Sequence, residues 1–228
     1  MTYELFLFDL DDTLLDFKAS EKLSFRNALE SFGVKDNHPQ LFQDYQRINN
    51  ELWKAFEDGK TSKEELKSER FRRLFSKHKL EIDAKEAGIR YLDNLPETVV
   101  LVDHAIEVCE WLASRGEVGI VSNGIHATQV KRIAKTKLGA HFSFVAVSEQ
   151  SGFAKPDVRF FEFAVKLARK FNKATTVMIG DRLETDILGA HNFGIDGVWF
   201  NPGRLDHGGH LPPKHEIDHL SKLRAIFD

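Results

Sequence analysis

The chain has 228 residues, and its 42% of hydrophobic side chains suffices for one substantial core, or for one core with a smaller second one. Its 32 basic and 35 acidic residues give a formal net charge of −3, which excludes the electrostatic signature of a nucleic-acid-binding protein and any general attraction to anionic membranes. The single cysteine, Cys109, excludes an intrachain disulfide, and its spacing from Ile106 and Leu112 predicts a buried position on a helix.

The chain also lacks targeting and membrane-spanning signals. The N-terminus has neither the basic region nor the long apolar stretch of a secretory signal. No window holds the roughly 18 apolar residues that a membrane span requires. We therefore expect a soluble, cytoplasmic protein with no membrane partner, no nucleic acid polymer as partner and no obligate protein partner.

The N-terminal part of the chain predicts one strand followed by a helical insertion. Residues 2–8 are short, apolar and rich in β-forming side chains, which is typical of a buried strand. From residue 18 to residue 94, apolar side chains recur at spacings of three and four, as in Leu41, Tyr45, Ile48 and Leu52. Turn-forming residues divide this region into about four amphipathic helices, which predicts a small helical bundle.

Beyond Pro96 the pattern changes to alternating helices and strands. We predict helices over residues 102–115, 126–138, 158–170 and 185–192, and strands over residues 117–124, 142–148, 175–181 and 196–200. Such alternation is typical of an α/β fold, a parallel sheet with helices on both faces. The first strand belongs to this sheet, so we predict a core formed by residues 1–16 and 96–228, with residues 17–95 inserted after the first strand.

Polar side chains gather where the predicted strands end. The carboxyl ends of parallel strands meet at one edge of an open sheet, and ligands bind at that edge. Each of these fragments is common by itself, but four in order, each at a strand end, form a specific pattern. They are Asp9 and Asp11 after the first strand, Ser122, Asn123 and Gly124 after the second, Lys155 after the third, and Asp181 and Asp186 after the fourth.

Three carboxylates at one edge require a counter-charge. We expect Asp9, Asp11 and Asp181 to converge, and buried carboxylates are costly unless something neutralises them. An oxygen-only ligand set with space for water suits Mg²⁺ better than Zn²⁺, which prefers histidine or cysteine. Together with the nearby cation of Lys155, the pattern indicates a metal site that binds an anionic substrate, with phosphate as the obvious candidate.

The segments DLDDT, SNG, KPD and GDRLETD together resemble the four motifs of the haloacid dehalogenase-like hydrolases. The resemblance covers the whole predicted core, and the insertion resembles the helical cap that this superfamily places after its first motif. It implies a Rossmann-like core, Mg²⁺ as cofactor, and an aspartyl-enzyme mechanism that acts on a small phosphorylated metabolite.

The resemblance also implies roles for the acidic residues. Asp9 resembles the family nucleophile, which would attack a phosphoryl group and form an aspartyl-phosphate. Asp11 resembles the acid/base, which would protonate the leaving alkoxide and later accept a proton from water. Asp181 would bind Mg²⁺ with Asp9 and the backbone carbonyl of Asp11, whereas Asp186 would orient its neighbours.

Four further motif positions would bind the phosphoryl group itself. Ser122 would form a hydrogen bond to the phosphoryl oxygens. Backbone N–H groups around Asn123 and Gly124 would assist, because turn amides commonly bind anions. Lys155 would stabilise the negative charge on the phosphoryl oxygens.

Asp11 separates two chemistries within the superfamily. An alkoxide leaving group needs a proton, whereas a halide does not, and the haloacid dehalogenases lack an aspartate at this position. The sequence therefore favours a phosphatase over a 2-haloacid dehalogenase. A non-catalytic binding protein is the third hypothesis, and it is disfavoured because this chain retains every motif residue.

The substrate is predicted from the cap and from the C-terminal region. Phe17, Trp53, Phe56 and Phe71 either face the active site and stack on a base or fill the core of the bundle. The stretches DGKTSKEELKSERF and VWFNPGRL with HEIDHLSKL resemble the pyrimidine 5′-nucleotidase subgroup. We therefore predict a nucleoside 5′-monophosphate as substrate, with sugar phosphates and other small phosphomonoesters as alternatives.

The C-terminal region contains an unusual cluster of histidines, namely His207, His210, His215 and His219. A zinc site is one hypothesis, although the spacing matches no standard zinc pattern. The density of glycine and proline instead predicts an exposed loop that carries solvated histidines.

Overall fold

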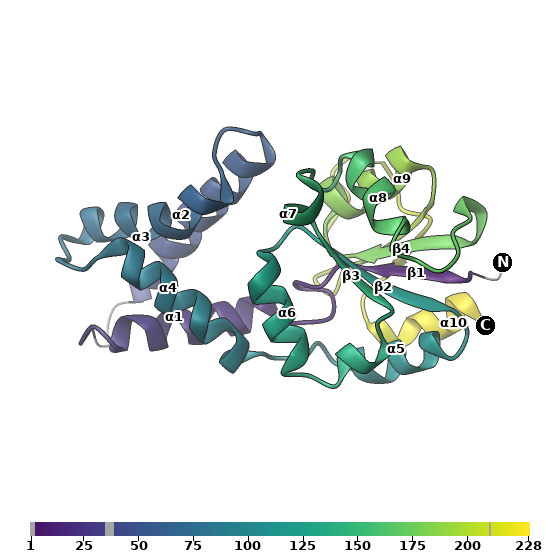
Figure 1. Ribbon diagram of the computed structural model, residues 1–228, viewed down its shortest axis with the longest axis horizontal. Helices are drawn as coiled ribbons and strands as arrows, with labels where there is room; N and C mark the ends of the chain where they lie inside the picture. The colour runs from purple at the N-terminus through teal and green to yellow at the C-terminus, as the bar shows by residue number, and fades with distance from the viewer. Residues whose placement is uncertain (1–2, 35–38, 210) are drawn as a thin grey trace. The chain divides into compact units, whose positions relative to one another are not determined.

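The computed structural model describes residues 3–34, 39–209 and 211–228. The chain forms two compact units (Figure 1), one of Met1–Phe17 with Val100–Asp228 and the other of Lys18–Val99. The first unit contains a β-sheet, and the second is helical. The divisions predicted from the sequence fall after residues 16 and 95, close to these boundaries.

The first unit is built on a six-stranded sheet in which every neighbouring pair is parallel. Its strands are β1 (Leu5–Phe8), β2 (Glu117–Ser122), β3 (Phe144–Val147), β4 (Thr176–Gly180), β5 (Asp196–Phe200) and β6 (His215–Ile217), in the order β3-β2-β1-β4-β5-β6. All four residues of β1 are apolar and buried, as expected for a strand covered on both faces. Because β1 lies between β2 and β4, the residues that follow these three strands share one edge of the sheet.

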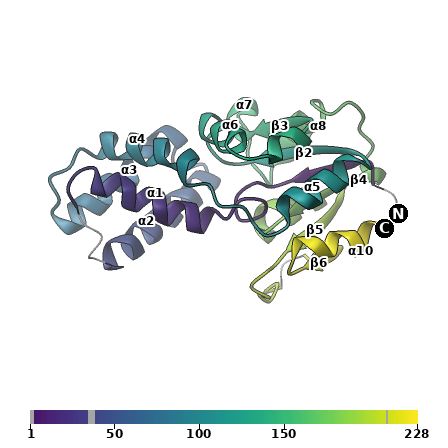
Figure 2. The ribbon, with the colours of Figure 1, turned by 90° about the horizontal axis from the view of Figure 1, so that it is seen from below.

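Helices cover both faces of the sheet (Figure 2). They are α5 (Ala105–Ala113), α6 (His126–Ala134), α7 (Ser148–Ser151), α8 (Val158–Val165), α9 (Leu188–Phe193) and α10 (Leu223–Phe227). Successive side chains of a strand point to opposite faces. Leu7 packs in one hydrophobic cluster with Phe161 of α8, whereas the Phe6 ring lies 5.5 Å from that of Phe227 in α10. The predicted α/β fold, a parallel sheet with helices on both faces, is confirmed.

Shorter helical segments complete this unit. They are the 3₁₀ helices η2 (Leu138–His141), η3 (Lys173–Thr175) and η5 (Leu220–Lys222), and the π-helix η4 (Leu183–Ile187). The predicted helix over residues 185–192 is thus divided between η4 and α9, and the helix predicted over residues 158–170 ends at Val165. Cys109 is a free, buried thiol on α5, as predicted.

The prediction of an exposed histidine-rich loop is wrong from His215 onward. His215 begins β6, which pairs with β5 through Val198 and Phe200. A strand of three residues is too short to show an alternating pattern, so its pairing with β5 decides its conformation.

His207 is exposed, and His210 lies outside the described residues. No group of three potential metal ligands among the residues that the structure describes contains His207, His215 or His219.

The second unit contains the four helices that the sequence predicts. They are α1 (Phe17–Glu30), α2 (Pro39–Glu57), α3 (Lys63–His78) and α4 (Ala84–Asn94), followed by the 3₁₀ helix η1 (Leu95–Thr98). A capping box formed by Ser62 and Glu65 starts α3. No helix within the described part of the chain combines the length and the apolar content needed to cross a membrane.

Aromatic rings form the core of the second unit. The Phe71 ring lies 5.4 Å from that of Tyr45 and 5.8 Å from that of Tyr91. Phe71 is fully buried, so it fills the bundle core and is unavailable for contact with a substrate. Trp53 and Phe56 on α2 are half-buried, and their rings pack edge to face at 5.8 Å.

Gly119 provides a test of how tightly the sheet is packed. It pairs with Phe144 across β2 and β3, and a Cβ at residue 119 would lie 2.2 Å from the Phe144 ring. We expect Gly119→Ala to lower the free energy of unfolding by about 1–3 kcal/mol, because the ring must move within a packed core. Urea denaturation measures this loss. Gly203→Ala is the control, because its Cβ would make only ordinary contacts at 3.6 Å, and an equal loss in both variants would contradict the prediction.

Candidate active site

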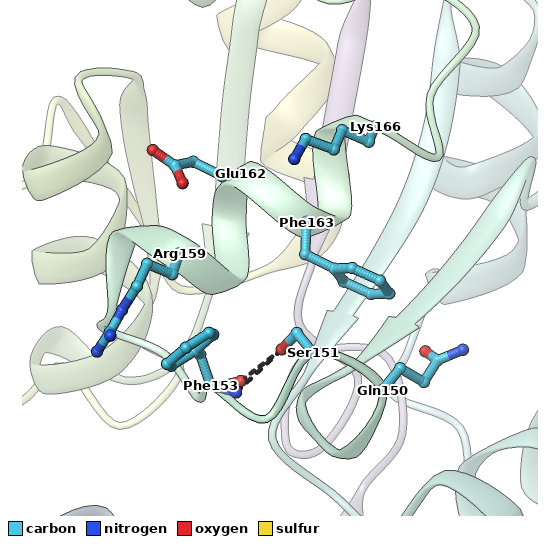
Figure 3. Close-up of a pocket in the computed structure, with 7 residues that line it drawn as sticks. All are labelled: Gln150, Ser151, Phe153, Arg159, Glu162, Phe163 and Lys166. Carbon is cyan, nitrogen blue, oxygen red and sulfur yellow. Dashed lines mark hydrogen bonds between the residues drawn. The ribbon is translucent and has the colours of Figure 1, made fainter.

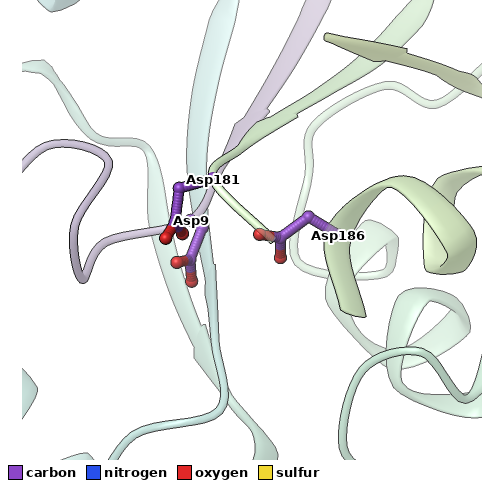
Figure 4. Close-up of side chains that lie close together, drawn as sticks. All are labelled: Asp9, Asp181 and Asp186. Carbon is purple, nitrogen blue, oxygen red and sulfur yellow. The ribbon is translucent and has the colours of Figure 1, made fainter. Parts of the chain in front are cut away.

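Three carboxylates converge at the carboxyl end of the central strand, those of Asp9 and Asp186 buried and that of Asp181 half-buried. Asp9 directly follows β1, and its backbone N–H donates to the carbonyl of Ile179 in β4 at 2.9 Å. Asp181 directly follows β4. Each of Asp9, Asp181 and Asp186 offers an oxygen within 4.8 Å of the others (Figure 4). The parallel register of β1 and β4 explains why residues far apart in sequence meet here.

Lys155 contributes the cation of this carboxylate cluster. Its Nζ atom lies 2.6 Å from Oδ1 of Asp9 and 2.7 Å from Oδ1 of Asp186, and its side chain is 2% exposed. Asn123 fixes the backbone of this lysine. The Asn123 Oδ1 atom accepts from the Lys155 N–H at 2.8 Å, and the Asn123 Nδ2 group donates to the Lys155 carbonyl at 3.0 Å. The Asn123 side chain therefore links the loop after β2 to the loop that carries Lys155.

The third carboxylate of the cluster belongs to Asp186, whereas the sequence predicted Asp11. Asp186 lies in η4, the π-helix, and its Oδ2 atom accepts from the backbone N–H of Arg182 at 3.0 Å. A Cβ at residue 180 would lie 2.3 Å from this oxygen, so Gly180 provides the space that the carboxylate occupies. π-helical turns are common at functional sites, where they direct a side chain that a regular helix would place elsewhere.

The backbone and side chain of Asp181 are held by two residues that sequence reasoning did not select. The Trp199 indole N–H donates to the Asp181 carbonyl at 2.8 Å. The Thr13 hydroxyl donates to Oδ1 of Asp181 at 3.4 Å. Thr13 lies in the turn after β1. Its contact with Asp181 shows that this turn also reaches the carboxylate cluster.

The electrostatics of the cluster show an excess of negative charge. Burial raises the pKa of Asp9 from 3.8 to about 7, although Lys155 opposes this shift. Burial, followed by the charge of Asp9, raises the pKa of Asp181 from 3.8 to about 9. Burial alone would lower the pKa of Lys155, but Asp186 and Asp9 outweigh it and raise the pKa to about 12. One lysine therefore does not balance three carboxylates, and this all-oxygen set fits a hard divalent cation.

Asp11 does not belong to the carboxylate cluster, contrary to the expectation from the sequence. Its Oδ1 atom pairs with Nη1 of Arg132, and its Oδ2 atom accepts from Nε2 of Gln129 at 2.6 Å. The same Gln129 Nε2 group donates to Oγ of Ser122 at 3.0 Å. The side chain of Asp11 is thus held by α6, which follows the Ser122 loop directly.

Sequence reasoning missed Gln129 and Arg132, although a signal for them exists. Both are buried on the face of α6 that also carries Ile133. Two long polar side chains, three positions apart on the inward face of a helix, lie side by side and need buried partners. That requirement could have identified the two residues, but not which partners they bind.

A separate hollow lies beside α7 and α8 (Figure 3). It encloses about 330 Å³, and the Arg159 guanidinium lies 3.8 Å from the centre of the Phe153 ring on its wall. Its lining consists of Gln150, Ser151, Phe153, Arg159, Glu162, Phe163 and Lys166. None of the residues predicted to act in chemistry lines this hollow, so the carboxylate cluster is the candidate active site.

Comparison with known proteins identifies the family. A family model described as haloacid dehalogenase-like hydrolase matches residues 3–194. The pyrimidine 5′-nucleotidase PynA of Streptococcus pneumoniae is 38% identical, over 100% of this chain and 96% of its own. The pyrimidine 5′-nucleotidase YjjG of Escherichia coli is 26% identical, over 100% and 99%. The glyceraldehyde 3-phosphate phosphatase of Pyrococcus furiosus is 30% identical, over 88% and 82%.

A solved structure supports the same assignment across both units. The HAD-hydrolase YfnB from Bacillus subtilis, described as bound to magnesium, matches with a TM-score of 0.93 and 33% sequence identity. The match covers 100% of each chain. The family match spans every motif at the strand ends, including the carboxylate cluster. The chain is therefore an enzyme of the haloacid dehalogenase-like hydrolase family, and it resembles those members that are named pyrimidine 5′-nucleotidases.

Proposed function

We propose that this enzyme is a Mg²⁺-dependent phosphomonoester hydrolase that acts through an aspartyl-phosphate on Asp9, with a pyrimidine nucleoside 5′-monophosphate as substrate. One observation carries the proposal. The Lys155 Nζ atom lies 2.6 Å from the Asp9 carboxylate at the end of the central strand. A phosphoryl group brought to this carboxylate would meet the buried cation at the same point, so attack and charge stabilisation would occur together.

Asp9 and Asp11 would divide the covalent chemistry between them. An Asp9 oxygen attacks phosphorus and forms a new P–O bond while the bond to the ester oxygen breaks. Asp11 gives a proton to the departing alkoxide. A water molecule then attacks the aspartyl-phosphate, and Asp11 accepts one of its protons. The products are an alcohol and inorganic phosphate, and both aspartates return to their starting states.

Ser122 is prepared to donate a hydrogen bond to the phosphoryl group. Its Oγ atom accepts from the Gly124 N–H at 3.1 Å and from the Gln129 Nε2 group at 3.0 Å. These two contacts use both lone pairs of the hydroxyl, so its proton is left to donate to a further acceptor. A phosphoryl oxygen would be such an acceptor, and Lys155, oriented by Asp186, would stabilise the charge on the other oxygens.

The chemistry of the carboxylate set supports Mg²⁺ as the cofactor. Asp9 and Asp181, with the backbone carbonyl of Asp11, would hold the ion, and Asp186 would orient Lys155. When bound, Mg²⁺ would reduce the repulsion between the Asp9 carboxylate and the anionic phosphoryl group. The relative YfnB, described as bound to magnesium, supports this assignment.

The choice of a nucleotide rests on similarity over the whole chain. PynA and YjjG, both named pyrimidine 5′-nucleotidases, match all of this chain, including residues 18–99. Within that unit, Trp53 and Phe56 are half-buried and thus available to stack on a base, whereas Phe71 is buried. Sugar phosphates are the second candidate class, favoured by the similarity to the Pyrococcus furiosus glyceraldehyde 3-phosphate phosphatase.

The substrate class is tested by phosphate release from a panel of esters with Mg²⁺ present. We expect kcat/KM for UMP and CMP to exceed the values for ribose 5-phosphate and glyceraldehyde 3-phosphate by at least about 10-fold, because a stacked base adds binding energy of about 1–3 kcal/mol. Faster release from the sugar phosphates would reject the nucleotide assignment but keep the phosphatase assignment.

The nucleophile is tested by Asp9→Asn. This variant keeps the size of the side chain but removes the attacking oxygen anion, so we expect kcat to fall at least about 10³-fold. Its thermal unfolding temperature should stay the same or rise, because a buried charge is removed. Ser151→Ala, in the separate hollow, is the control and should retain wild-type turnover. Wild-type turnover in Asp9→Asn would reject the mechanism.

The raised pKa values predict how Mg²⁺ affinity depends on pH. Burial raises the pKa of Asp9 from 3.8 to about 7 and the pKa of Asp181 from 3.8 to about 9, so at pH values between these limits the metal-free fold binds more protons than the unfolded chain. Metal-free stability should therefore fall as pH rises from 6 to 9, while stabilisation by Mg²⁺ grows, because protons no longer compete for the ligands. Thermal unfolding with EDTA and with Mg²⁺ measures both trends.

The same measurement on Asp181→Asn provides the control for this pH dependence. The variant lacks the carboxylate whose pKa is raised most, so its metal-free stability should vary less between pH 6 and 9. Stabilisation by Mg²⁺ should be largely lost at both pH values. Equal Mg²⁺ stabilisation of the wild type at pH 6 and pH 9 would contradict the prediction.

A further inference from the structure

Arg132 is a buried cation whose charge is directed at one carboxylate. Its side chain is 1% exposed, and its Nη1 atom contacts Oδ1 of Asp11 and Oε1 of Gln129, the latter at 2.8 Å. Within the described part of the chain, its Nε and Nη2 atoms are buried without a hydrogen-bond partner. A guanidinium with unused donors is costly to bury, so stability alone does not explain it. The partner that accounts for its position is Asp11.

Gln129 joins this cation to the loop that is proposed to bind phosphate. Its side chain crosses directly over Gly124, where a Cβ would lie 2.3 Å from the Gln129 Nε2 atom. The glycine of the SNG segment thus leaves the space through which this amide passes. Beyond it, the Nε2 group donates to Oγ of Ser122 at 3.0 Å and to Oδ2 of Asp11 at 2.6 Å.

The contacts on Asp11 fix its orientation but leave room for proton transfer. Its side chain is 29% exposed, so packing alone would not select one rotamer. Arg132 holds one carboxylate oxygen and Gln129 holds the other. Each oxygen of a carboxylate has about two acceptor sites, so one site on each remains for the proton that Asp11 passes on.

We propose that Arg132 and Gln129 are positioning residues that hold the Asp11 carboxylate in the orientation for proton transfer and join it to Ser122. This inference rests on the proposed function, because it concerns the acid/base of the same reaction. Both residues lie on α6, which begins four residues after Ser122, so the helix sets the spacing between the acid/base and the phosphoryl-binding hydroxyl. The ring of Phe17, the first residue of α1, is centred 5.3 Å from the Arg132 guanidinium and stabilises this cation through a cation–π contact.

The test compares two esters that differ in their need for a proton. An alkoxide must be protonated as it leaves, whereas p-nitrophenolate leaves without a proton. For the alkyl phosphate that the wild type hydrolyses fastest, we expect Arg132→Met to lower kcat about 10²-fold, with KM within about 2-fold of the wild type. With p-nitrophenyl phosphate, the variant should release the first equivalent of p-nitrophenol at the wild-type rate. Later turnovers should be slow, because the attacking water still needs Asp11.

Three further variants make this result specific. Lys131→Met removes the same charge from the neighbouring, exposed position on α6 and should retain wild-type kinetics with both esters. Arg132→Lys keeps the charge and should recover part of the lost activity. Gln129→Leu removes a neutral side chain of similar size together with its contact to Ser122. The first equivalent should therefore slow, but by a smaller factor than alkyl phosphate hydrolysis, and this holds even if Arg132→Met does not fold.

Three outcomes would overturn the inference. The release of the first equivalent of p-nitrophenol could slow by the same factor as alkyl ester hydrolysis. The residues on α6 would then stabilise the whole site and would have no specific role in proton transfer by Asp11. Unchanged turnover of both esters in Arg132→Met and Gln129→Leu would likewise reject the positioning role while leaving the proposed function intact. A wild type that releases phosphate from no ester would overturn the proposed function and this inference together.

Discussion

The structure depends on a charge imbalance that the fold maintains at the end of its central strand. Asp9, Asp181 and Asp186 are held within 4.8 Å of one another with Lys155 as their cation, in a place where burial penalises every ionised group. The sheet makes this possible, because β1 and β4 are adjacent and parallel and therefore end together. The imbalance suits the divalent cation proposed as cofactor, and the fold places Asp9, the proposed nucleophile, next to a buried ammonium group.

Much of this arrangement could be predicted from the sequence, because it follows from strand ends. Each strand that is followed by a proposed site residue is short and largely apolar, so its end could be located, and the parallel sheet then determines which ends meet. The exchange of Asp11 for Asp186 in the carboxylate cluster could not be predicted in this way. It depends on the π-helical turn of η4 and on the space left by Gly180, and neither has a periodic signal in the sequence.

The two units differ in how far the sequence determines the role of a residue. In the helical unit, the spacing of apolar side chains predicted four helices, but it did not separate rings that fill the core from rings that remain accessible. Phe71 belongs to the first group, and Trp53 and Phe56 belong to the second. The distinction depends on how the helices rotate against one another, which side-chain volumes settle only when the bundle packs.

The double hydrogen bond between the Asn123 side chain and the Lys155 backbone has a consequence for how this architecture can vary. Lys155 is positioned by the loop after β2 rather than by the end of β3, which lies eight residues earlier in the chain. The intervening segment, which includes α7, therefore does not set the place of the ammonium group. Insertions or deletions there can reshape the surface beside the site while the distance from the lysine to Asp9 stays constant.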